Sequence, residues 1–419
     1  MRFLYSFLLY LLIPLALARL VWRGLGNRDY WRCWPERFGF VPRLSGPLIW
    51  LHAVSVGEVR ASAPLVKALA RDYPGHTILI TTMTPTGSAT VHELFGNSVA
   101  HCYVPYDLPT AVWRFLNRTR PQLALIMETE LWPNLFHQCR KRNIPLVLAN
   151  VRMSEKSARA YRRFAGSARA TLANVSRVGA QTESDAERLR ALGAEQVEVT
   201  GSIKFEMDVP ADLVARASAL RSGFGERPVW VAASTRVGEE GYVLDAFARL
   251  RERIPRLLLV LVPRHPERFD SVARLCQLRG FRIERRSVRK DGVAPDTAIL
   301  LGDTMGEMLL FHAVADVSYI GGSLVPRGGQ NLLEAAAVGT PVVFGPHMYN
   351  FSDIKRMSIE RGAAREVHDA VELAQAVEDW LGDPAARHAA GDSGRRMVEE
   401  NRGALDRTLV LIRRAFAGG

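Results

Sequence analysis

The stretch that most constrains the fold is Asp316–Pro346, which reads DVSYIGGSLVPRGGQNLLEAAAVGTPVVFGP. Its apolar run Val317–Ile320 has the residue types of a strand, and it breaks into a loop that holds Gly321, Gly322, Gly328 and Gly329. A helical pattern begins near Gln330, and a second apolar run, Pro341–Phe344, follows it. Strand, glycine loop, helix and strand in this order predict a parallel βαβ unit.

The loop and first helical turn of this stretch carry groups that suit a ligand. Glycines let a backbone approach a ligand closely, and a helix N-terminus offers unpaired N–H groups to an anion. Asn331 and Glu334 are three residues apart, so they project from one side of the turn and could bind hydroxyls of a ribose or sugar. The alternative is a tight turn of any α/β protein. The polar pair favours a nucleotide site.

The same alternation of strand and helix patterns extends over most of the chain. Because 419 residues exceed one ordinary core, two domains are expected, joined through the polar segment 204–226. The pattern predicts an α/β protein with two Rossmann-like, doubly wound domains, 25–205 and 206–419, the second including the C-terminal helices, and a ligand cleft between them. The expected strands besides those named above are Leu48–Ala53, Thr77–Thr82, Leu123–Met127, Pro145–Asn150, Arg177–Gln181, Val197–Gly201, Val229–Ala233, Leu257–Val262 and Ala298–Leu301.

The N-terminus is almost wholly apolar from Phe3 to Val21, with a length that is borderline for a membrane span. Ala16-Leu17-Ala18 resembles a signal-peptidase site, so a cleaved signal is the alternative. One arginine precedes the run and several follow it, which favours an uncleaved anchor with the rest of the chain in the cytoplasm. We therefore expect residues 1–24 to attach the chain to the inner membrane, either spanning it or lying in its inner leaflet. The basic and aromatic residues that follow the run are Arg19, Trp22, Arg23, Arg28, Tyr30, Trp31, Arg32 and Trp34.

The net charge of +12 has several possible meanings. It suits nucleic acid, an anionic membrane or a phosphorylated substrate, or it is simply a solvated basic surface. No nucleic-acid-binding motif is present, so we expect no nucleic-acid partner. The four cysteines are scattered without a CxxC, and neither HxxxH nor a DxD motif occurs. These observations predict reduced thiols, no metal and no other cofactor.

The expected strand ends of the first domain carry acidic residues. Glu58 lies in Val54–Ala61, where a loop containing Ser55 and Gly57 turns into a helix. It either favours the helix dipole or acts as a general base whose pKa is raised by partial burial. Glu128 and Glu130 follow the third expected strand and need partners if they are buried, for which Arg152 is a candidate. The alternative for one of the two is a structural ion pair.

Cations and hydroxyls mark other strand ends. Lys204 could neutralise a substrate carboxylate or phosphate, or it is an exposed linker lysine. Ser234 and Thr235 precede a helical pattern, so they suit either an N-cap or a phosphate site. Arg264 follows Leu257–Val262 in a loop with two prolines, where a guanidinium suits a phosphate leaving group.

The next strand-to-helix junction, Leu301–Met308, can present backbone groups of Met305 and Gly306 to a base.

Seven motifs in order resemble those of the 3-deoxy-D-manno-oct-2-ulosonic acid (Kdo) transferases of lipopolysaccharide assembly, and the resemblance covers nearly the whole chain. The resemblance implies the GT-B architecture and transfer of Kdo, with inversion and without metal, from CMP-Kdo to a tetraacylated lipid A precursor (lipid IVA). The motifs are HAVSVGEVRA (52–61), METELWPN (127–134), GSIKFE (201–206), ASTRVGEE (233–240), VPRHPERF (262–269), GDTMGE (302–307) and GGSLVPRGGQNLLEAAA (321–337).

The resemblance also implies roles for individual residues. Glu58 would accept the proton of the attacking sugar hydroxyl. Binding of CMP is expected at Pro263, Arg264, Met305, Gly306, Glu307, Asn331, Leu332, Leu333 and Glu334. Further substrate contacts are expected at Ser55, Gly57, Glu128, Glu130, Lys204, Ser234, Thr235, Gly322 and Ser323.

Two positions depart from the family pattern. Gln330 and Arg236 stand where the family usually or commonly has histidine. Gln330 cannot carry charge, and Arg236 keeps a permanent one. These two differences would change local contacts to Kdo or to an acceptor phosphate.

Two other functions fit the same sequence. One is a GT-B transferase that uses a UDP-sugar and a lipid-linked acceptor. The other is a membrane-associated nucleotide-binding protein without catalysis, against which Glu58 and the paired glutamates argue, because a pure binder needs no base.

Overall fold

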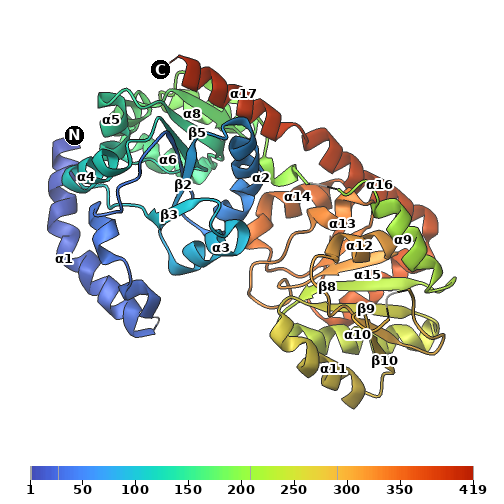
Figure 1. The fold of residues 1–419 in the computed structure, drawn as a ribbon. Coiled ribbons are helices and arrows are strands. Elements are labelled where there is room, and N and C mark those ends of the chain that lie inside the picture. Colours follow the sequence, from blue (N-terminus) through green and yellow to red (C-terminus); the bar gives the residue numbers. More distant parts are fainter. Residues whose placement is uncertain (1, 27, 208, 290, 419) are drawn as a thin grey trace. The chain divides into compact units, whose positions relative to one another are not determined.

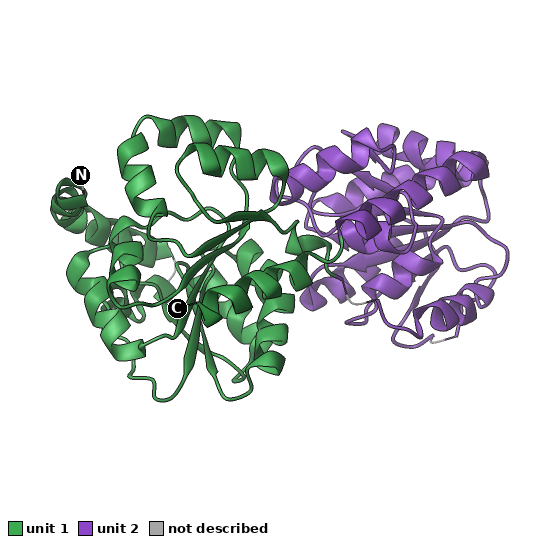
Figure 2. Cartoon of the chain, turned by 90° about the horizontal axis from the view of Figure 1, so that it is seen from above, with its two compact units in different colours: residues 1–206, 402–419 green, residues 207–401 purple. Residues whose placement is uncertain are grey.

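The structure is a computed structural model that describes residues 2–26, 28–207, 209–289 and 291–418. The chain forms two compact units (Figure 2). Unit 1 comprises residues 1–206 and 402–419, and unit 2 comprises residues 207–401. Each unit has its own parallel sheet and its own hydrophobic core.

Unit 1 is built on a seven-stranded parallel sheet of order β3-β2-β1-β4-β5-β6-β7. In the register of its centre, Ile49 of β1 is paired with Ile78 of β2 on one side and Leu123 of β4 on the other. The register of β5 against β6 shifts between Leu148 and Val151. The strands are β1 (Leu48–His52), β2 (Thr77–Thr82), β3 (Ala100–Tyr103), β4 (Leu123–Met127), β5 (Leu146–Val151), β6 (Arg177–Ala180) and β7 (Val197–Val199).

Helices cover both faces of this sheet (Figure 1). Leu48 and Trp50 of β1 join the core under α4 and α5, whereas Ile49 and Leu51 join the core under α2 and α17. Because both faces are covered, the central strands β1 and β4 are nearly continuous apolar runs rather than alternating ones. The helices of unit 1 are α1 (Arg2–Gly26), α2 (Val56–Asp72), α3 (Pro85–Phe95), α4 (Pro109–Thr119), α5 (Pro133–Lys141), α6 (Glu155–Arg162), α7 (Ala165–Leu172), α8 (Glu183–Ala191) and α17 (Ala404–Ala417), with 3-10 turns η1 (Arg28–Trp31), η2 (Trp34–Phe38) and η3 (Ile203–Phe205).

Unit 2 repeats this plan with a seven-stranded parallel sheet of order β10-β11-β9-β8-β12-β13-β14. Its strands are β8 (Val229–Thr235), β9 (Leu258–Pro263), β10 (Ile283–Arg285), β11 (Ile299–Leu301), β12 (Val317–Ile320), β13 (Val342–Phe344) and β14 (Ala364–Glu366). Its helices are α9 (Leu213–Ser222), α10 (Glu239–Arg253), α11 (Phe269–Leu278), α12 (Met308–Val314), α13 (Leu333–Ala337), α14 (Ser352–Glu360), α15 (Ala370–Gly382) and α16 (Pro384–Asn401), with 3-10 turns η4 (Pro266–Arg268) and η5 (Tyr349–Phe351).

The predicted α/β fold is confirmed, and each strand expected from the sequence is present within two residues of its predicted ends. The sequence did not predict three of the strands, namely β3, β10 and β14. Each is short, lies at a sheet edge and has a polar or charged residue within or at the end of its apolar run, so it lacks the continuous apolar pattern by which buried strands are recognised.

The helix expected near Gln330 begins later, at Leu333. The Asn331 side chain explains the delay, because its Oδ1 accepts the Leu333 N–H at 3.1 Å. An Asn side chain that binds the backbone in this way competes with helical hydrogen bonds and leaves its own residue outside the helix.

The last helix corrects the expectation that the C-terminal helices belong to the second domain. Helix α17 lies in unit 1, where Leu409, Leu411 and Ile412 are buried in the same core as Ile49. The Arg407 guanidinium also donates to the Thr200 carbonyl at 2.9 Å. The chain therefore leaves unit 1 after Glu206 and returns to it at Arg402.

Helix α1 is 25 residues long and has the length and composition needed to cross a membrane. It belongs to unit 1 and runs beside α4 and α5 (Figure 1).

Candidate active site

Glu58 lies at the start of α2, where the chain turns out of β1. The Ser55 hydroxyl caps this helix by accepting the Glu58 N–H at 3.3 Å. The Glu58 carboxylate accepts the Ser55 hydroxyl at 2.9 Å and the Val54 N–H at 2.7 Å. This reciprocal arrangement is a variant of the capping box, which the spacing of Ser55 and Glu58 could have indicated. It fixes the carboxylate in place and leaves Glu58 only 8% exposed.

The environment of Glu58 raises its pKa to near neutral pH. Burial, followed by the negative charge of Glu128, raises the pKa of Glu58 from 4.5 to about 7, against the opposing effect of its two hydrogen bonds. A carboxyl with such a pKa can accept and release protons at neutral pH. The capping contacts and the raised pKa are properties of the same side chain, so the two interpretations of Glu58 do not exclude each other.

Glu128 and Glu130 follow β4 and face different partners. Glu128 has a left-handed backbone, with φ of 58°, and its carboxylate lies 3.2 Å from the Lys204 ammonium. The Glu130 carboxylate accepts the indole N–H of Trp132 at 2.9 Å, and burial raises its pKa. Left-handed conformations of residues other than glycine are costly and gather at functional sites.

These carboxylates line a hollow in unit 1 of about 310 Å³. It lies at the carboxyl edge of the sheet, beyond β1, β4 and β5, where parallel α/β sheets bind their ligands. Its lining combines three carboxylates with one guanidinium and three hydroxyls, so it suits a polar ligand rather than an apolar one. The lining residues are Glu58, Glu128, Thr129, Glu130, Arg152, Ser154 and Ser157.

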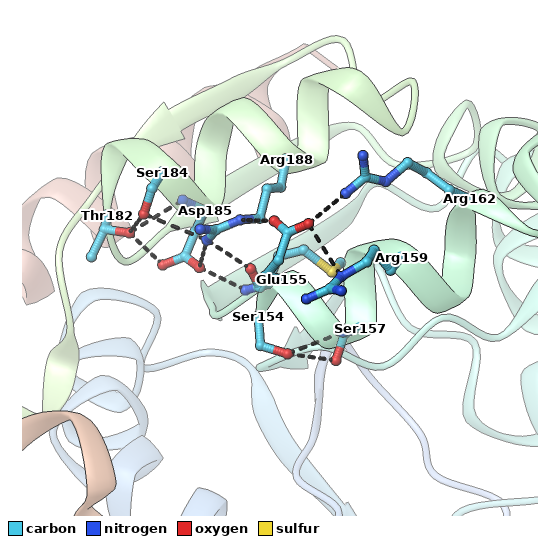
Figure 3. Close-up of polar contacts among 10 residues, drawn as sticks. Ser154, Glu155, Ser157, Arg159, Arg162, Thr182, Ser184, Asp185 and Arg188 are labelled. Atoms are coloured by element: carbon cyan, nitrogen blue, oxygen red, sulfur yellow. Dashed lines mark hydrogen bonds and ion pairs between the residues drawn. The ribbon is translucent and has the colours of Figure 1, made fainter.

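Ser154 and Ser157 were not predicted, and they belong to a network that anchors α6 (Figure 3). The Ser154 hydroxyl caps α6 by accepting the Ser157 N–H at 3.1 Å. Next to it, Glu155 lies 2.8 Å from Arg162 and 3.3 Å from Arg188. The signal in the sequence was a serine three residues after the end of an apolar strand, at the position of a helix cap.

Lys204 is positioned by a residue that the sequence analysis missed. Asn150, at the end of β5, is fully buried with a left-handed φ of 57°. Its side-chain Oδ1 accepts the Ile203 N–H at 3.1 Å. This bond holds η3, the turn that carries Lys204, against the end of the sheet. Lys204 is therefore the cation paired with Glu128 rather than a loose linker residue.

In unit 2 the glycine loop after β12 is organised by a buried carboxylate. Glu239 of α10 is fully buried and accepts the N–H groups of Gly322 at 2.6 Å and Ser323 at 2.9 Å. It also accepts the Leu324 N–H at 3.0 Å and the Tyr319 hydroxyl at 2.8 Å. The Glu239 carboxylate thus occupies three backbone donors at the start of this loop.

The substrate contacts expected at Gly322 and Ser323 remain a prediction, and the structure shows internal hydrogen bonds at both residues. Ser323 is fully buried, its hydroxyl donates to the Ile320 carbonyl, and it accepts the Gly345 N–H at 2.8 Å. Burial and internal hydrogen bonds leave this side chain turned into the unit.

Ser234 and Thr235 do not cap the following helix. Both belong to β8, and the N-cap of α10 is Gly238. Thr235 is fully buried, and its hydroxyl donates to the Glu240 carboxylate at 3.0 Å. Ser234 has a left-handed φ of 55° at the end of its strand. The cap was misplaced because β8 continues two residues beyond its expected end.

The structure brings Arg264 together with the polar pair of the glycine stretch. The Asn331 amide donates to the Glu334 carboxylate at 3.1 Å. Burial raises the pKa of Glu334, while the Asn331 hydrogen bond and the Arg264 charge oppose the rise. Arg264 itself follows β9, and its N–H donates to the Thr235 carbonyl at 3.0 Å. The neighbouring Pro263 is the last residue of β9, and the intervening Leu332 and Leu333 are fully buried.

Met305, Gly306 and Glu307 form the turn between β11 and α12. Met305 is 67% exposed, and Gly306 has a left-handed φ of 79° that favours glycine. The Glu307 carboxylate is held by two contacts to the Arg286 guanidinium, at 2.9 and 3.1 Å. Because β11 is paired with β9 in parallel, this turn and Arg264 lie at the same edge of the sheet. Of the two positions that depart from the family pattern, Arg236 contacts His265 through its guanidinium.

The two parallel seven-stranded sheets define the fold class of the GT-B glycosyltransferases. Among solved structures, a glycosyltransferase from Rickettsia africae covers 90% of this chain and 100% of its own, with a TM-score of 0.54 and 13% identity. MurG of Acinetobacter baumannii covers 88% of this chain and 100% of its own, with a TM-score of 0.55 and 10% identity. At sequence identities of 13% and 10%, these structural similarities show the fold alone.

Sequence comparison identifies the family within that class. The family model described as 3-Deoxy-D-manno-octulosonic-acid transferase (kdotransferase) matches residues 32–207. A 3-deoxy-D-manno-octulosonic acid transferase of Haemophilus influenzae is 41% identical, covering 98% of both chains. A protein of the same name from Bordetella pertussis is 40% identical over 96% of this chain and 98% of its own. The chain belongs to the Kdo transferase family of glycosyltransferases.

Proposed function

We propose that this chain transfers Kdo from CMP-Kdo to the tetraacylated lipid A precursor, with inversion and without a metal. The observation that carries the proposal is the hollow in unit 1, where Glu58 has a pKa of about 7 beside two further glutamates. Family membership supports Kdo as the transferred sugar. The donor, the acceptor and the stereochemistry are the parts of the proposal that need direct measurement.

In this mechanism Glu58 acts as the general base. Its carboxylate removes the proton from an acceptor hydroxyl as that oxygen attacks the anomeric carbon of Kdo. The new glycosidic bond forms while the bond from Kdo to the CMP phosphate breaks, and CMP leaves with the bonding electrons. A positioned base of this kind contributes about 10²- to 10⁴-fold to the rate.

The basic surface beside the hollow supports a phosphorylated acceptor. Helix α6 and its flanks expose several basic side chains next to the lining residues Ser154 and Ser157. Guanidinium groups bind phosphate oxygens in pairs, which makes arginine suited to this task. The exposed basic residues are Arg152, Lys156, Arg159, Arg162 and Arg163.

Unit 2 would bind the donor. The proposed CMP contacts are Arg264, the turn Met305–Glu307 and the pair Asn331 and Glu334, which lie at the carboxyl edge of the unit 2 sheet. Arg264 can stabilise the departing phosphate without a proton transfer. The chain would act at the cytoplasmic side of the inner membrane, attached through its apolar N-terminus and its net charge of +12.

The test is an incubation of the purified full chain with CMP-Kdo and tetraacylated lipid A precursor in EDTA, followed by mass spectrometry. A gain of one or more Kdo units is expected, and the anomeric configuration of the product reports inversion. Product that appears only after magnesium is added would refute metal independence alone. Folded chain that binds CMP but yields no product in either condition would refute the proposed acceptor. Inhibition by UDP but not by CMP would refute the proposed donor.

A further inference from the structure

Helix α1 contacts the rest of unit 1 along one face and over its whole length. The positions that are shielded from solvent recur at intervals of one, three and four residues, which is the period of a helix packed on one side. They extend from the first to the last turn of α1. Its first half lies beside α4 and α5 (Figure 1), whereas Trp31 of η1 covers Gly24 in the last turn and donates its indole N–H to the Val21 carbonyl at 3.3 Å. These shielded positions are Arg2, Tyr5, Ser6, Leu9, Ile13, Ala16, Leu17, Leu20 and Gly24.

Polar contacts fasten the first half of this face. The Ser6 hydroxyl shares its proton between the Arg2 carbonyl at 2.9 Å and the Asn134 side-chain oxygen at 3.1 Å, and the Tyr10 and Thr110 hydroxyls lie 2.9 Å apart. Tyr5 forms a hydrogen bond with Asp107, a carboxylate that is 5% exposed. We call these three contacts, Tyr5–Asp107, Ser6–Asn134 and Tyr10–Thr110, the polar seam.

Asp107 ties the polar seam to the fold of unit 1. Its carboxylate accepts the N–H groups of Asn134 at 3.0 Å and Leu135 at 2.7 Å, at the start of α5. Separating α1 from the unit would remove the Tyr5 hydroxyl from this buried group. Buried polar groups that lose a partner cost folding free energy, so the seam resists separation.

The opposite face of α1 is apolar and exposed. Its large side chains are between 49% and 83% exposed, and the helix ends in the exposed pair Trp22 and Leu25. Arg19 and Arg23 are also exposed near that end. An apolar face with arginine and tryptophan at its margin is typical of a helix that lies at a membrane surface. The exposed apolar side chains are Phe3, Leu4, Phe7, Leu8, Leu11, Leu12 and Leu15.

A helix that spans a bilayer must satisfy a different condition, because lipid surrounds it on all sides. By length, 25 residues at about 1.5 Å each could cross a hydrocarbon core of about 30 Å. Crossing would require either breaking the polar seam or drawing α4, α5 and the buried Asp107 into hydrocarbon. The first alternative separates polar side chains of α1 from their partners, and the second places charged residues of α4 and α5 in lipid, so both are costly.

We propose that α1 lies in the plane of an anionic bilayer, with its polar seam closed and its exposed face in one leaflet. The occupant of the exposed face is therefore lipid, and the helix does not span. The positive net charge of the chain complements anionic headgroups and supplies the second attraction that stable attachment needs.

The first test cross-links α1 to α4 so that the polar seam cannot open. Tyr10→Cys and Thr110→Cys are introduced into the full chain with Cys33→Ser, which removes the exposed native thiol. A short bis-maleimide then joins the two new thiols, and binding to phosphatidylglycerol–phosphatidylethanolamine vesicles is measured by flotation. The locked chain is expected to bind as tightly as the same variant without the reagent. Loss of binding on locking would overturn the proposal, since it would mean that the seam opens in the membrane.

The second test distinguishes lipid from a second copy of the chain. The double variant Leu8→Glu and Leu12→Glu is expected to lower vesicle affinity by about 100-fold or more, because two exposed leucines leave the lipid and two charges enter it. Val214→Glu, at an exposed apolar position of unit 2, is the matched control and should bind normally. Unchanged vesicle binding by the double variant, with loss of a dimer seen by light scattering, would assign the face to self-association instead.

A third measurement reads the orientation directly. Nitroxide labels at positions 4, 8, 11 and 15 are expected to report similar, shallow depths of about 5 to 10 Å below the headgroups. A spanning helix would instead give depths that change by about 1.5 Å per residue along the chain. That second pattern would refute the in-plane arrangement.

Discussion

Replacement of Glu58 by glutamine separates the catalytic interpretation of this residue from the purely structural one. The change preserves the size of the side chain and its acceptor oxygen for the Val54 N–H. It removes the charge, so the base is lost and activity should fall by about 10²- to 10⁴-fold. A helix cap alone predicts no such loss.

The same variant should be more stable than the wild type at alkaline pH. The folded-state pKa of Glu58 is about 7 and its ordinary value is 4.5, so the folded state binds the proton more tightly than the unfolded state. A raised carboxyl pKa therefore favours folding as pH falls through the window from 7 to 4.5, and it opposes folding above that window. The difference of roughly 2.5 pKa units corresponds to at most about 3 kcal/mol of folding free energy.

Glu58→Gln avoids this cost, so at pH 8 its melting temperature should rise by several degrees, at about 2 to 4 °C per kcal/mol for a unit of this size. At pH 4 the two proteins should have nearly equal stability. The assays are Kdo transfer at saturating substrates and thermal unfolding at both pH values. A variant that is inactive but less stable than wild type at pH 8 would refute the reasoning, because it would make Glu58 a structural cap.

Three further predictions follow from contacts of single residues. Glu128→Gln removes a negative charge that raises the pKa of Glu58, so the acid limb of the plot of kcat/KM against pH should move to lower pH. Lys204→Met removes the cation paired with Glu128 and should move the same limb to higher pH. An identical limb in the wild type and both variants would contradict an electrostatic effect of Glu128 and Lys204 on Glu58. Glu239→Gln places an amide N–H group among backbone N–H donors, so unit 2 should lose about 2 kcal/mol of stability in urea unfolding. The variant should also bind CMP more weakly in calorimetry. Normal CMP affinity would show that the glycine loop does not contribute to binding of the sugar donor. Leu411→Ala should destabilise unit 1 by about 2 to 5 kcal/mol, and a urea midpoint equal to that of wild type would mean that α17 contributes little to its core.

Much of the fold could be predicted because the buried strands of parallel sheets are continuous apolar runs. Leu48–His52 and Leu123–Met127 are read directly from such runs. Edge strands such as Ile283–Arg285 could not be predicted, since half-exposed strands carry mixed residues. The return of α17 to unit 1 was also hidden, because an amphipathic helix pattern indicates a buried face without naming its partner.

The carboxylates of the candidate site were predictable from the sequence, whereas its serines and its contacts were not. The sequence placed Glu58 and Glu128 at strand ends, and parallel strands bring their carboxyl ends to one edge. It could not pair Lys204 with Glu128, which is 76 residues away, or find Asn150, whose role depends on a left-handed backbone. Glu239 was part of a recognised motif, but its hydrogen-bond donors come from a loop more than 80 residues later. Contacts of this kind depend on topology, which local patterns do not encode.

The return of α17 to unit 1 has a consequence for how the chain is made. The ribosome delivers residues 207–401, and with them all of unit 2, before it delivers the helix that covers Ile49 and Leu51 of unit 1. Domains usually mature in the order of their synthesis, but here the domain begun first is completed last. Until translation ends, the nascent chain carries a sheet with part of one apolar face uncovered, next to an N-terminal helix with an apolar face of its own. Early capture of that helix by the bilayer would hold the unfinished domain apart from other nascent chains while its last layer is synthesised.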